Sequence, residues 1–313
     1  MICAPAPRHR GPVSLGAILL PVSLLIAIAA GCHGPVATSG PDAAVGPSYH
    51  FKTDPIHLEA GGESTTMTPG NFSNDRAIWI TRFQMHTQPG LHHFRMDAPP
   101  DMRFPVYTIF SPPVGSWEVD QPFSPGFALS LPAAQPLWLS MHYLNASPMA
   151  QDYTLEMVVD TLPEGAPAPI PLSQIAFLTE SISLPPLSAT DVDVTCIIPT
   201  DIDLHSLLSH THGLGKGVDA VVVGGEHDGE TIYTTTEWDG APNLKFDPPL
   251  HLRAGDAIHW TCHYYNDTGK LVQYGASAAE EMCGVAGYYS PGPVPIFGMV
   301  QMGQTNCTVV TLD

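Results

Sequence analysis

The most constraining feature of this sequence is a succession of short segments in which apolar and polar residues alternate. Clear examples are AIWITRFQM (77–85), YTLEMVV (153–159) and DAIHWTCHYY (256–265). Alternation with a period of two is typical of strands that bury one face, and 33 prolines and 28 glycines supply turns between them. No segment predicts a long amphipathic helix. The sequence therefore predicts an all-β fold of antiparallel strands.

The length of the chain and a break near its middle indicate two domains. With 313 residues the chain is long enough for two cores of ordinary size. The segment DTLPEGAPAPIPLSQ (160–174) is rich in proline and glycine and lies near the midpoint. We therefore predict two tandem β-sandwiches of jelly-roll type, spanning residues 49–165 and 166–313, with a cleft between them. No internal sequence repeat relates the two halves.

The N-terminal residues predict export. Arg8 and Arg10 precede an apolar run from about Val13 to Ala30, and small residues lead to Cys32. This layout is typical of a signal peptide, which we place at residues 1–31. The ending AIAAGC resembles the lipobox of bacterial lipoproteins, in which the cysteine is acylated. The alternative is an ordinary cleaved signal followed by an unmodified cysteine.

Acylation of Cys32 would fix the mature chain to a membrane by its N-terminus. Several acyl chains on one residue anchor a protein stably, whereas a single chain does not. Residues 32–48 are rich in glycine, proline and small side chains and would form a flexible tether. The expected location is the bacterial periplasm or cell surface, with membrane contact only through the lipid. Without acylation the protein would be secreted.

The charge balance excludes nucleic acid as a partner. Lysine and arginine together number 11 against 30 acidic residues, which gives a net charge of −19. A phosphate backbone would be repelled by such a surface. The 15 histidines, several of which are clustered, indicate metal binding instead.

Four cysteines lie in the second half of the chain. They are Cys196, Cys262, Cys283 and Cys307. In an exported protein they indicate two disulfides, for which three pairings are possible. A structural zinc site is the alternative, but no closely spaced cysteine pair supports it.

The strongest local signal for a metal is the motif HTHGLGK (210–216). Residues two apart on an extended chain project from the same face, so His210 and His212 would grip one ion while Thr211 faces away. Taken alone, the motif is also compatible with two histidines on a solvated strand.

A second pair, His92 and His93, occurs in LHHFRM. Adjacent side chains on a regular strand point to opposite faces, so joint binding of one ion would need a β-bulge or a strand end. Pro89 and Gly90 just upstream favour such an irregularity.

Two further candidates are His142, near the end of PLWLSMHYL (136–144), and Met282, in AEEMCG (279–284). Alone, each is ordinarily a packed residue. Their order with the two histidine pairs resembles that of the copper type II, ascorbate-dependent monooxygenases, which include peptidylglycine and dopamine hydroxylases. HTHGLGK and EEMC carry this resemblance most specifically, and 70 residues separate His212 from Met282.

The resemblance implies two copper ions per chain. An electron-transfer copper would be held by His92, His93 and His142. The copper at which O2 and substrate react would be held by His210, His212 and Met282. Imidazole suits both copper oxidation states, and a thioether favours Cu(I). Three protein ligands also leave positions open, as a catalytic metal requires.

The implied reaction is hydroxylation of an aliphatic C–H by O2, with ascorbate or a similar one-electron donor as co-substrate. The two coppers would face each other across the interdomain groove. The resemblance also implies the disulfides Cys262–Cys283 and Cys196–Cys307. The first would clamp the segment of Met282 to a neighbouring strand.

Three substrate-contact positions differ from the peptide-hydroxylating members of this family. Their arginine two residues before the HxH motif is Leu208 here, and the tyrosine four residues after the methionine is Ala286. Their asparagine two residues after the methionine is Gly284. We therefore expect a small aliphatic or aralkyl substrate.

Two other functions are compatible with parts of the sequence. A copper-binding protein without turnover, for storage or delivery, would use the same scaffold, and the missing polar substrate contacts favour it. A zinc or manganese hydrolase would need a carboxylate as base, and none lies close to the histidine pairs in sequence.

Overall fold

The computed structural model of the chain describes residues 46–70, 74–98, 108–292, 294–304 and 307–311. The expected signal peptide and Cys32 therefore lie outside the described residues, as does most of the tether. Every helix or strand assigned in the described part of the chain is a strand, which confirms the predicted all-β fold. Among these residues no helix is long and apolar enough to span a bilayer.

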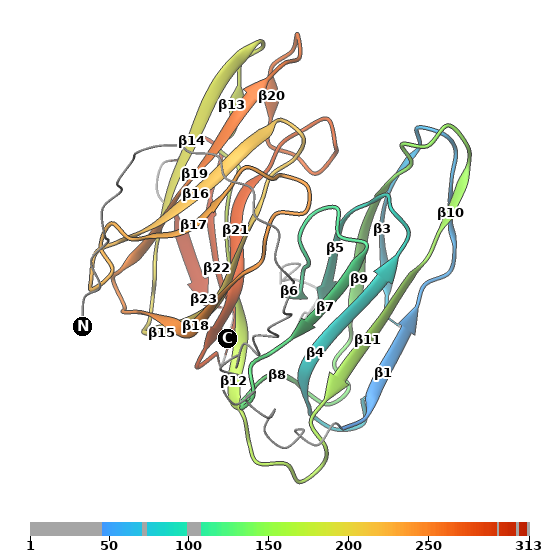
Figure 1. Ribbon diagram of the computed structural model, residues 1–313, viewed down its shortest axis with the longest axis vertical. Helices are drawn as coiled ribbons and strands as arrows, with labels where there is room; N and C mark the ends of the chain where they lie inside the picture. The colour runs from blue at the N-terminus through green and yellow to red at the C-terminus, as the bar shows by residue number, and fades with distance from the viewer. Residues whose placement is uncertain (1–45, 71–73, 99–107, 293, 305–306, 312–313) are drawn as a thin grey trace, which may run out of the picture. The chain divides into compact units, whose positions relative to one another are not determined.

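The first half is a two-layer sandwich. Its strands are β1 (Ser48–Lys52), β2 (Ile56–Leu58), β3 (Glu63–Pro69), β4 (Ile78–Thr87), β5 (Leu91–Asp97), β6 (Thr108–Phe110), β7 (Glu118–Pro122), β8 (Phe127–Leu131), β9 (Trp138–Leu144), β10 (Gln151–Tyr153) and β11 (Leu155–Thr161). One sheet has the order β3-β9-β5-β6 and the other the order β1-β11-β4-β8, with β7 also paired to β4 (Figure 1). Buried side chains from both sheets, including Phe83, Met141 and Met157, form one core.

The second half is a sandwich of the same kind. Its strands are β12 (Ile170–Thr179), β13 (Ser183–Leu184), β14 (Ser188–Ile197), β15 (Ile202–His210), β16 (Gly215–Val223), β17 (Thr231–Thr235), β18 (Leu244–Leu252), β19 (Ala257–Asn266), β20 (Val272–Gln273), β21 (Cys283–Ser290), β22 (Ile296–Val300) and β23 (Thr308–Thr311). One sheet has the order β14-β19-β16-β17 and the other β12-β21-β15-β18, with β22 and β23 added beside β12. Phe177, Trp260 and Tyr289 are buried in its core.

The strand order of the first half is repeated in the second. The sheets β3-β9-β5-β6 and β1-β11-β4-β8 correspond to β14-β19-β16-β17 and β12-β21-β15-β18, and the pair β2-β10 corresponds to β13-β20. The two halves therefore share a topology, although no sequence repeat relates them. A repeated strand order requires only the same alternation of buried and exposed positions, whereas residue identities are free to differ.

Asn145 and Asn266 mark equivalent turns in the two halves. Both side chains are fully buried, and each donates to the carbonyl oxygen four residues ahead, at 2.8 Å. Each also accepts the backbone N–H two residues ahead, at 3.0 Å. The strands that end at these turns share the pattern HYxN (142–145 and 263–266), a short sequence trace of the repeat.

The two sandwiches belong to one compact unit, residues 43–313. Strands β8 and β12 pair in parallel and join one sheet of each half into a single 11-stranded sheet. Tyr288 of β21 packs with the first-half core, and its hydroxyl donates to the carbonyl oxygen of Ile109 at 2.8 Å. The predicted boundary at 165/166 lies between β11 and β12. Division into two independent domains stays a prediction.

Both expected disulfides are present in the second half. Cys196 of β14 is bonded to Cys307, and Cys262 of β19 is bonded to Cys283 at the start of β21. All four thiols that might have bound zinc are therefore consumed, and the zinc alternative for the cysteines is wrong. The second bridge joins the two sheets of this sandwich directly beside Met282.

Candidate metal centre

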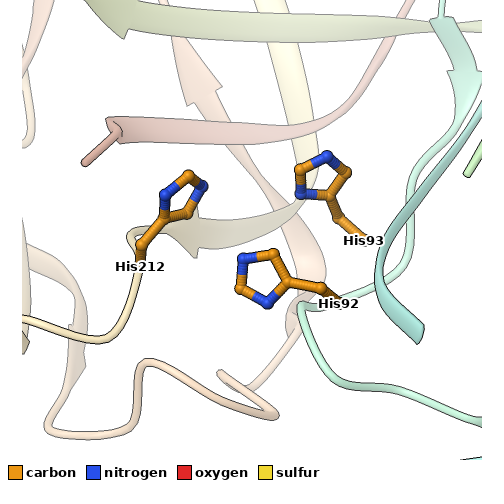
Figure 2. A group of neighbouring side chains, drawn as sticks. All are labelled: His92, His93 and His212. Atoms are coloured by element: carbon orange, nitrogen blue, oxygen red, sulfur yellow. The ribbon is translucent and has the colours of Figure 1, made fainter. Parts of the chain in front are cut away.

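Five imidazoles from both halves of the chain lie together, and we call them the histidine cluster. Its members are His92 and His93 in β5, His142 in β9, His210 at the end of β15, and His212 in the following loop. The ring centroids of His92 and His212 are 5.0 Å apart, and those of His93 and His142 are 4.8 Å apart. His210 lies 5.4 Å from His212. Figure 2 shows the rings of His92, His93 and His212 converging on a common space.

A bulge at the start of β5 brings both adjacent histidines into the cluster. The register with β9 shifts between Leu91 and His93, which confirms the expected irregularity. Gly90 just before it has a φ of 126°, and a side chain there would meet the ring of Tyr153 at 2.7 Å. Glycine is therefore required at this turn. As a result, the rings of His92 and His93 lie 5.2 Å apart instead of on opposite faces.

Burial keeps four of these imidazoles neutral, those of His92, His93, His210 and His212. Desolvation lowers the pKa of His92 to about 4 and the pKa of His210 to about 3, with further lowering from neighbouring imidazoles. The pKa values of His93 and His212 are lowered by the same causes, burial first. A metal binds the neutral imidazole, so these four rings are in the ligand form at neutral pH.

Four ring nitrogens of the cluster are buried without a hydrogen-bond partner among the described residues. They are His92 Nε2, His93 Nδ1, His142 Nδ1 and His212 Nε2. Buried polar atoms are nearly always paired, because leaving one unpaired costs about 1–3 kcal/mol. A bound metal ion would satisfy several of them at once. The donor set therefore fits a metal that prefers nitrogen ligands, such as copper or zinc.

Glu63 of β3 orients His142. The His142 ring is fully buried, and its Nε2 donates to Glu63 Oε1 at 2.5 Å. This bond fixes the tautomer and leaves the lone pair of Nδ1 available to a metal. Burial raises the pKa of the Glu63 carboxyl, but hydrogen bonds from His142 and the backbone N–H of Ala278 outweigh it and lower the pKa below its ordinary value. The carboxylate therefore remains charged at neutral pH.

Glu63→Ala is expected to weaken metal binding at His142 by about 10–100-fold, the usual effect of losing a carboxylate that orients a histidine ligand. The reason is that Nε2 of the buried ring would lose its acceptor and the ring its fixed orientation. Competition of Cu(I) with a chelator, carried to full loading of the chain with copper, measures the effect. Glu59→Ala, in which an exposed carboxylate near His57 is lost, is the control and should bind as the wild type does. Equal copper affinities of the two variants would show that Glu63 has no role in metal binding.

Glu281 holds the loop that carries His212. Its carboxylate, 1% exposed, accepts the backbone N–H groups of His212 at 2.8 Å and Leu214 at 2.7 Å. Nδ1 of His212 donates to the carbonyl oxygen of Glu280 at 2.9 Å, so Nε2 is the nitrogen left for a metal. Burial raises the pKa of Glu281 to about 7, although the backbone N–H groups lower it.

Met282 stands between Glu281 and the disulfide-bonded Cys283. Its carbonyl oxygen accepts the hydroxyl hydrogen bond of Tyr264. Two residues later, Gly284 pairs with His210 across β15 and β21. Met282 is therefore attached by its backbone to the same elements that carry His210 and His212.

The two predicted ligand sets are in contact. Besides the contact between His92 and His212, the rings of His93 and His210 are 5.7 Å apart. The imidazoles of the two sets therefore touch one another, where the resemblance implies a groove between the two ions. The loop after β6 also contacts the second half. Its Gly115 donates its backbone N–H to the carbonyl oxygen of His92 at 2.9 Å, and the carbonyl oxygen of the preceding Val114 accepts the backbone N–H of Gly240 at 2.6 Å.

Sequence reasoning named all five imidazoles but missed the two carboxylates beside them. Glu281 directly precedes Met282 in the quoted EEMC motif, so its position in that motif was the available signal. Glu63 lies 79 residues before His142, and nothing local in the sequence distinguishes it from other exposed strand residues. No carboxylate is close to the histidine pairs in the sequence, but Glu63 and Glu281 contact His142 and His212 in the folded chain.

Residues 172–303 match the family model described as copper type II ascorbate-dependent monooxygenase, C-terminal domain. No curated protein matches the chain. Among solved structures, the chain is similar to the major capsid protein P2 from bacteriophage PM2, at 9% identity and a TM-score of 0.38, over 78% of this chain and 97% of that one. It is also similar to the STIV MCP, at 12% identity and a TM-score of 0.37, over 79% and 98%. TM-scores this low do not establish a shared fold.

Proposed function

Because residues 172–303 belong to the copper type II ascorbate-dependent monooxygenase family, we propose that the protein is a copper-dependent monooxygenase. It would hydroxylate an aliphatic C–H group of a small molecule, using O2 and a one-electron donor such as ascorbate. The observation that carries the proposal is the histidine cluster, in which four buried ring nitrogens have no hydrogen-bond partner among the described residues. Imidazole is a good ligand for copper in either oxidation state.

Two ions per chain are proposed. The first would be held by His92, His93 and His142. The second would be held by His210, His212 and Met282. The unpartnered nitrogens of the first three rings and of His212 support the assignment, as does the attachment of Met282 beside the second pair. The thioether would favour the reduced ion at the second site.

The protein's own groups would hold the ligands and keep water away from them. Bound copper would supply the one-electron chemistry with O2. Glu63 would keep the Nδ1 lone pair of His142 directed at the first ion, and Glu281 would hold the backbone of the His212 loop. The side chains of His142 and His212 are fully buried, which limits the access of water to the reacting centre.

The surface beside His210 supports an uncharged substrate. Leu208 is two residues before His210 on β15, so the two side chains share a face of the strand. Leu208 pairs with Ala286 on β21, which makes this region apolar. A side chain at Gly284 would meet Leu178 at 2.3 Å, so this position has no room for a larger residue. We propose a small aliphatic or aralkyl compound as substrate.

An exported, lipid-anchored location is also proposed. The two disulfides support an oxidising compartment such as the bacterial periplasm or the cell surface. Acylation at Cys32 would provide the anchor, and the protein would be secreted if the lipobox is not used.

The test of the function is copper stoichiometry combined with ascorbate-driven oxygen consumption. The full-length protein, loaded with Cu(II), is offered a panel of small aliphatic and aralkyl compounds in the presence of ascorbate. We expect two coppers per chain, substrate-dependent oxygen uptake and an alcohol product. Two bound coppers without turnover on any compound would instead indicate a copper-binding protein without catalysis.

A further inference from the structure

One group of three imidazoles in the cluster comes from both halves of the chain. Among the described residues, the ring nitrogens of His92, His93 and His212 all lie within 4.8 Å of one another. Neither His142 nor His210 belongs to this group, although both rings are close by. Figure 2 shows that His212 approaches the first-half pair from the opposite side of the shared space.

Each of these three rings has a buried nitrogen with no hydrogen-bond partner among the described residues. The atoms are His92 Nε2, His93 Nδ1 and His212 Nε2. The other nitrogen of His212 is used by the Glu280 carbonyl, so this ring has one nitrogen to offer. Three converging neutral imidazole nitrogens are the protein ligand set of a nitrogen-coordinated Zn²⁺ or copper ion with an open fourth position.

His142 and His210 differ from these three in their surroundings. His142 is drawn toward β3 by its bond to Glu63, whose carboxylate also accepts the backbone N–H of Ala278 at 3.4 Å. His210 is the last residue of β15, where the backbone is held by pairing with Gly284. Both rings lie beside the group of three: the ring centroid of His142 is 5.0 Å from that of His92, and the ring centroid of His210 is 5.7 Å from that of His93.

We propose that a chain with one metal ion binds it at a shared site formed by His92, His93 and His212. The ion, Cu(I), Cu(II) or Zn²⁺, would be held between the two halves of the chain. This differs from the two-ion arrangement proposed above, in which His212 and the first-half pair serve separate ions. The shared site would be occupied when the chain holds one ion. Binding of a second ion would require His212 to move away from His92 and His93, so that each ion has its own ligand set. The inference does not depend on turnover, because it concerns metal affinity alone.

Cu(I) titration of the metal-free, full-length protein against a competing chelator tests the shared site at the first equivalent. We expect His92→Ala and His212→Ala to weaken binding of the first ion by at least about a hundredfold, since each removes a direct ligand. His142→Ala and His210→Ala remove rings outside the shared site, so they should weaken binding of the second ion and not of the first. His205→Ala is the matched control, because it removes a half-buried histidine of β15 that lies outside the histidine cluster, and it should bind both ions as the wild type does.

Hydrogen exchange of the wild type avoids the question of whether a variant folds. One equivalent of Cu(I) should slow exchange both at residues 91–93 and at residues 212–215. Protection of only one segment would overturn the shared site, and so would a first ion that depends on His142 but not on His212. Either result is distinct from failure of the proposed function, which is measured as absent oxygen uptake with two bound coppers.

Discussion

Met282→Ile is expected to reduce ascorbate-driven oxygen consumption by about a hundredfold or more, with copper at the first site retained. Isoleucine has nearly the volume of methionine, so the packing changes little, but the thioether sulfur is lost. A soft ligand stabilises Cu(I), which is the state that must meet O2 in the proposed reaction. The measurement is oxygen uptake together with copper content per chain.

Met299→Ile is the matched control for this variant. Met299 is also a half-buried methionine of the second half, in β22, and it is absent from the proposed ligand set. Its replacement should leave oxygen uptake and copper content near those of the wild type. Unchanged uptake in Met282→Ile would exclude the thioether as a ligand and contradict the assignment of the second site.

Removing the Cys262–Cys283 bridge is expected to lower the free energy of unfolding by about 2–5 kcal/mol, the usual effect of losing a native disulfide. It should also release the second copper before the first. Cys283 follows Met282 directly, and the bridge ties this segment to β19. Without the bridge the weakest ligand would lose its fixed position. Denaturant unfolding and copper content of Cys262→Ala/Cys283→Ala measure both effects.

Cys196→Ala/Cys307→Ala separates the local effect from a general loss of stability. This bridge also lies in the second half, but it closes a span of 111 residues and does not adjoin a proposed ligand. We expect a comparable loss of stability with both coppers retained under folding conditions. Equal loss of both coppers on removal of Cys262–Cys283 would show that this bridge has no specific role at Met282.

Much of the architecture was accessible from local patterns. Segments such as YTLEMVV alternate between apolar and polar residues, and β11 formed from it alternates between buried and more exposed positions. The bulge at His92 was also predictable, because two adjacent histidines share a site only where a strand is irregular. The repeated strand order was not predictable from residue identities, since only the short HYxN pattern is shared.

The sequence by itself determined the all-β class, the kinds of metal ligand and, through family resemblance, the cysteine pairing. These depend on residue type and on spacing along one strand, where a period of two decides which side chains share a face. Only the tertiary structure decided that His212 lies as close to His92 as His142 does, and that Glu63 orients His142. Such distances between strands far apart in the chain are set by the packing of the two sandwiches, and local spacing carries no information about them.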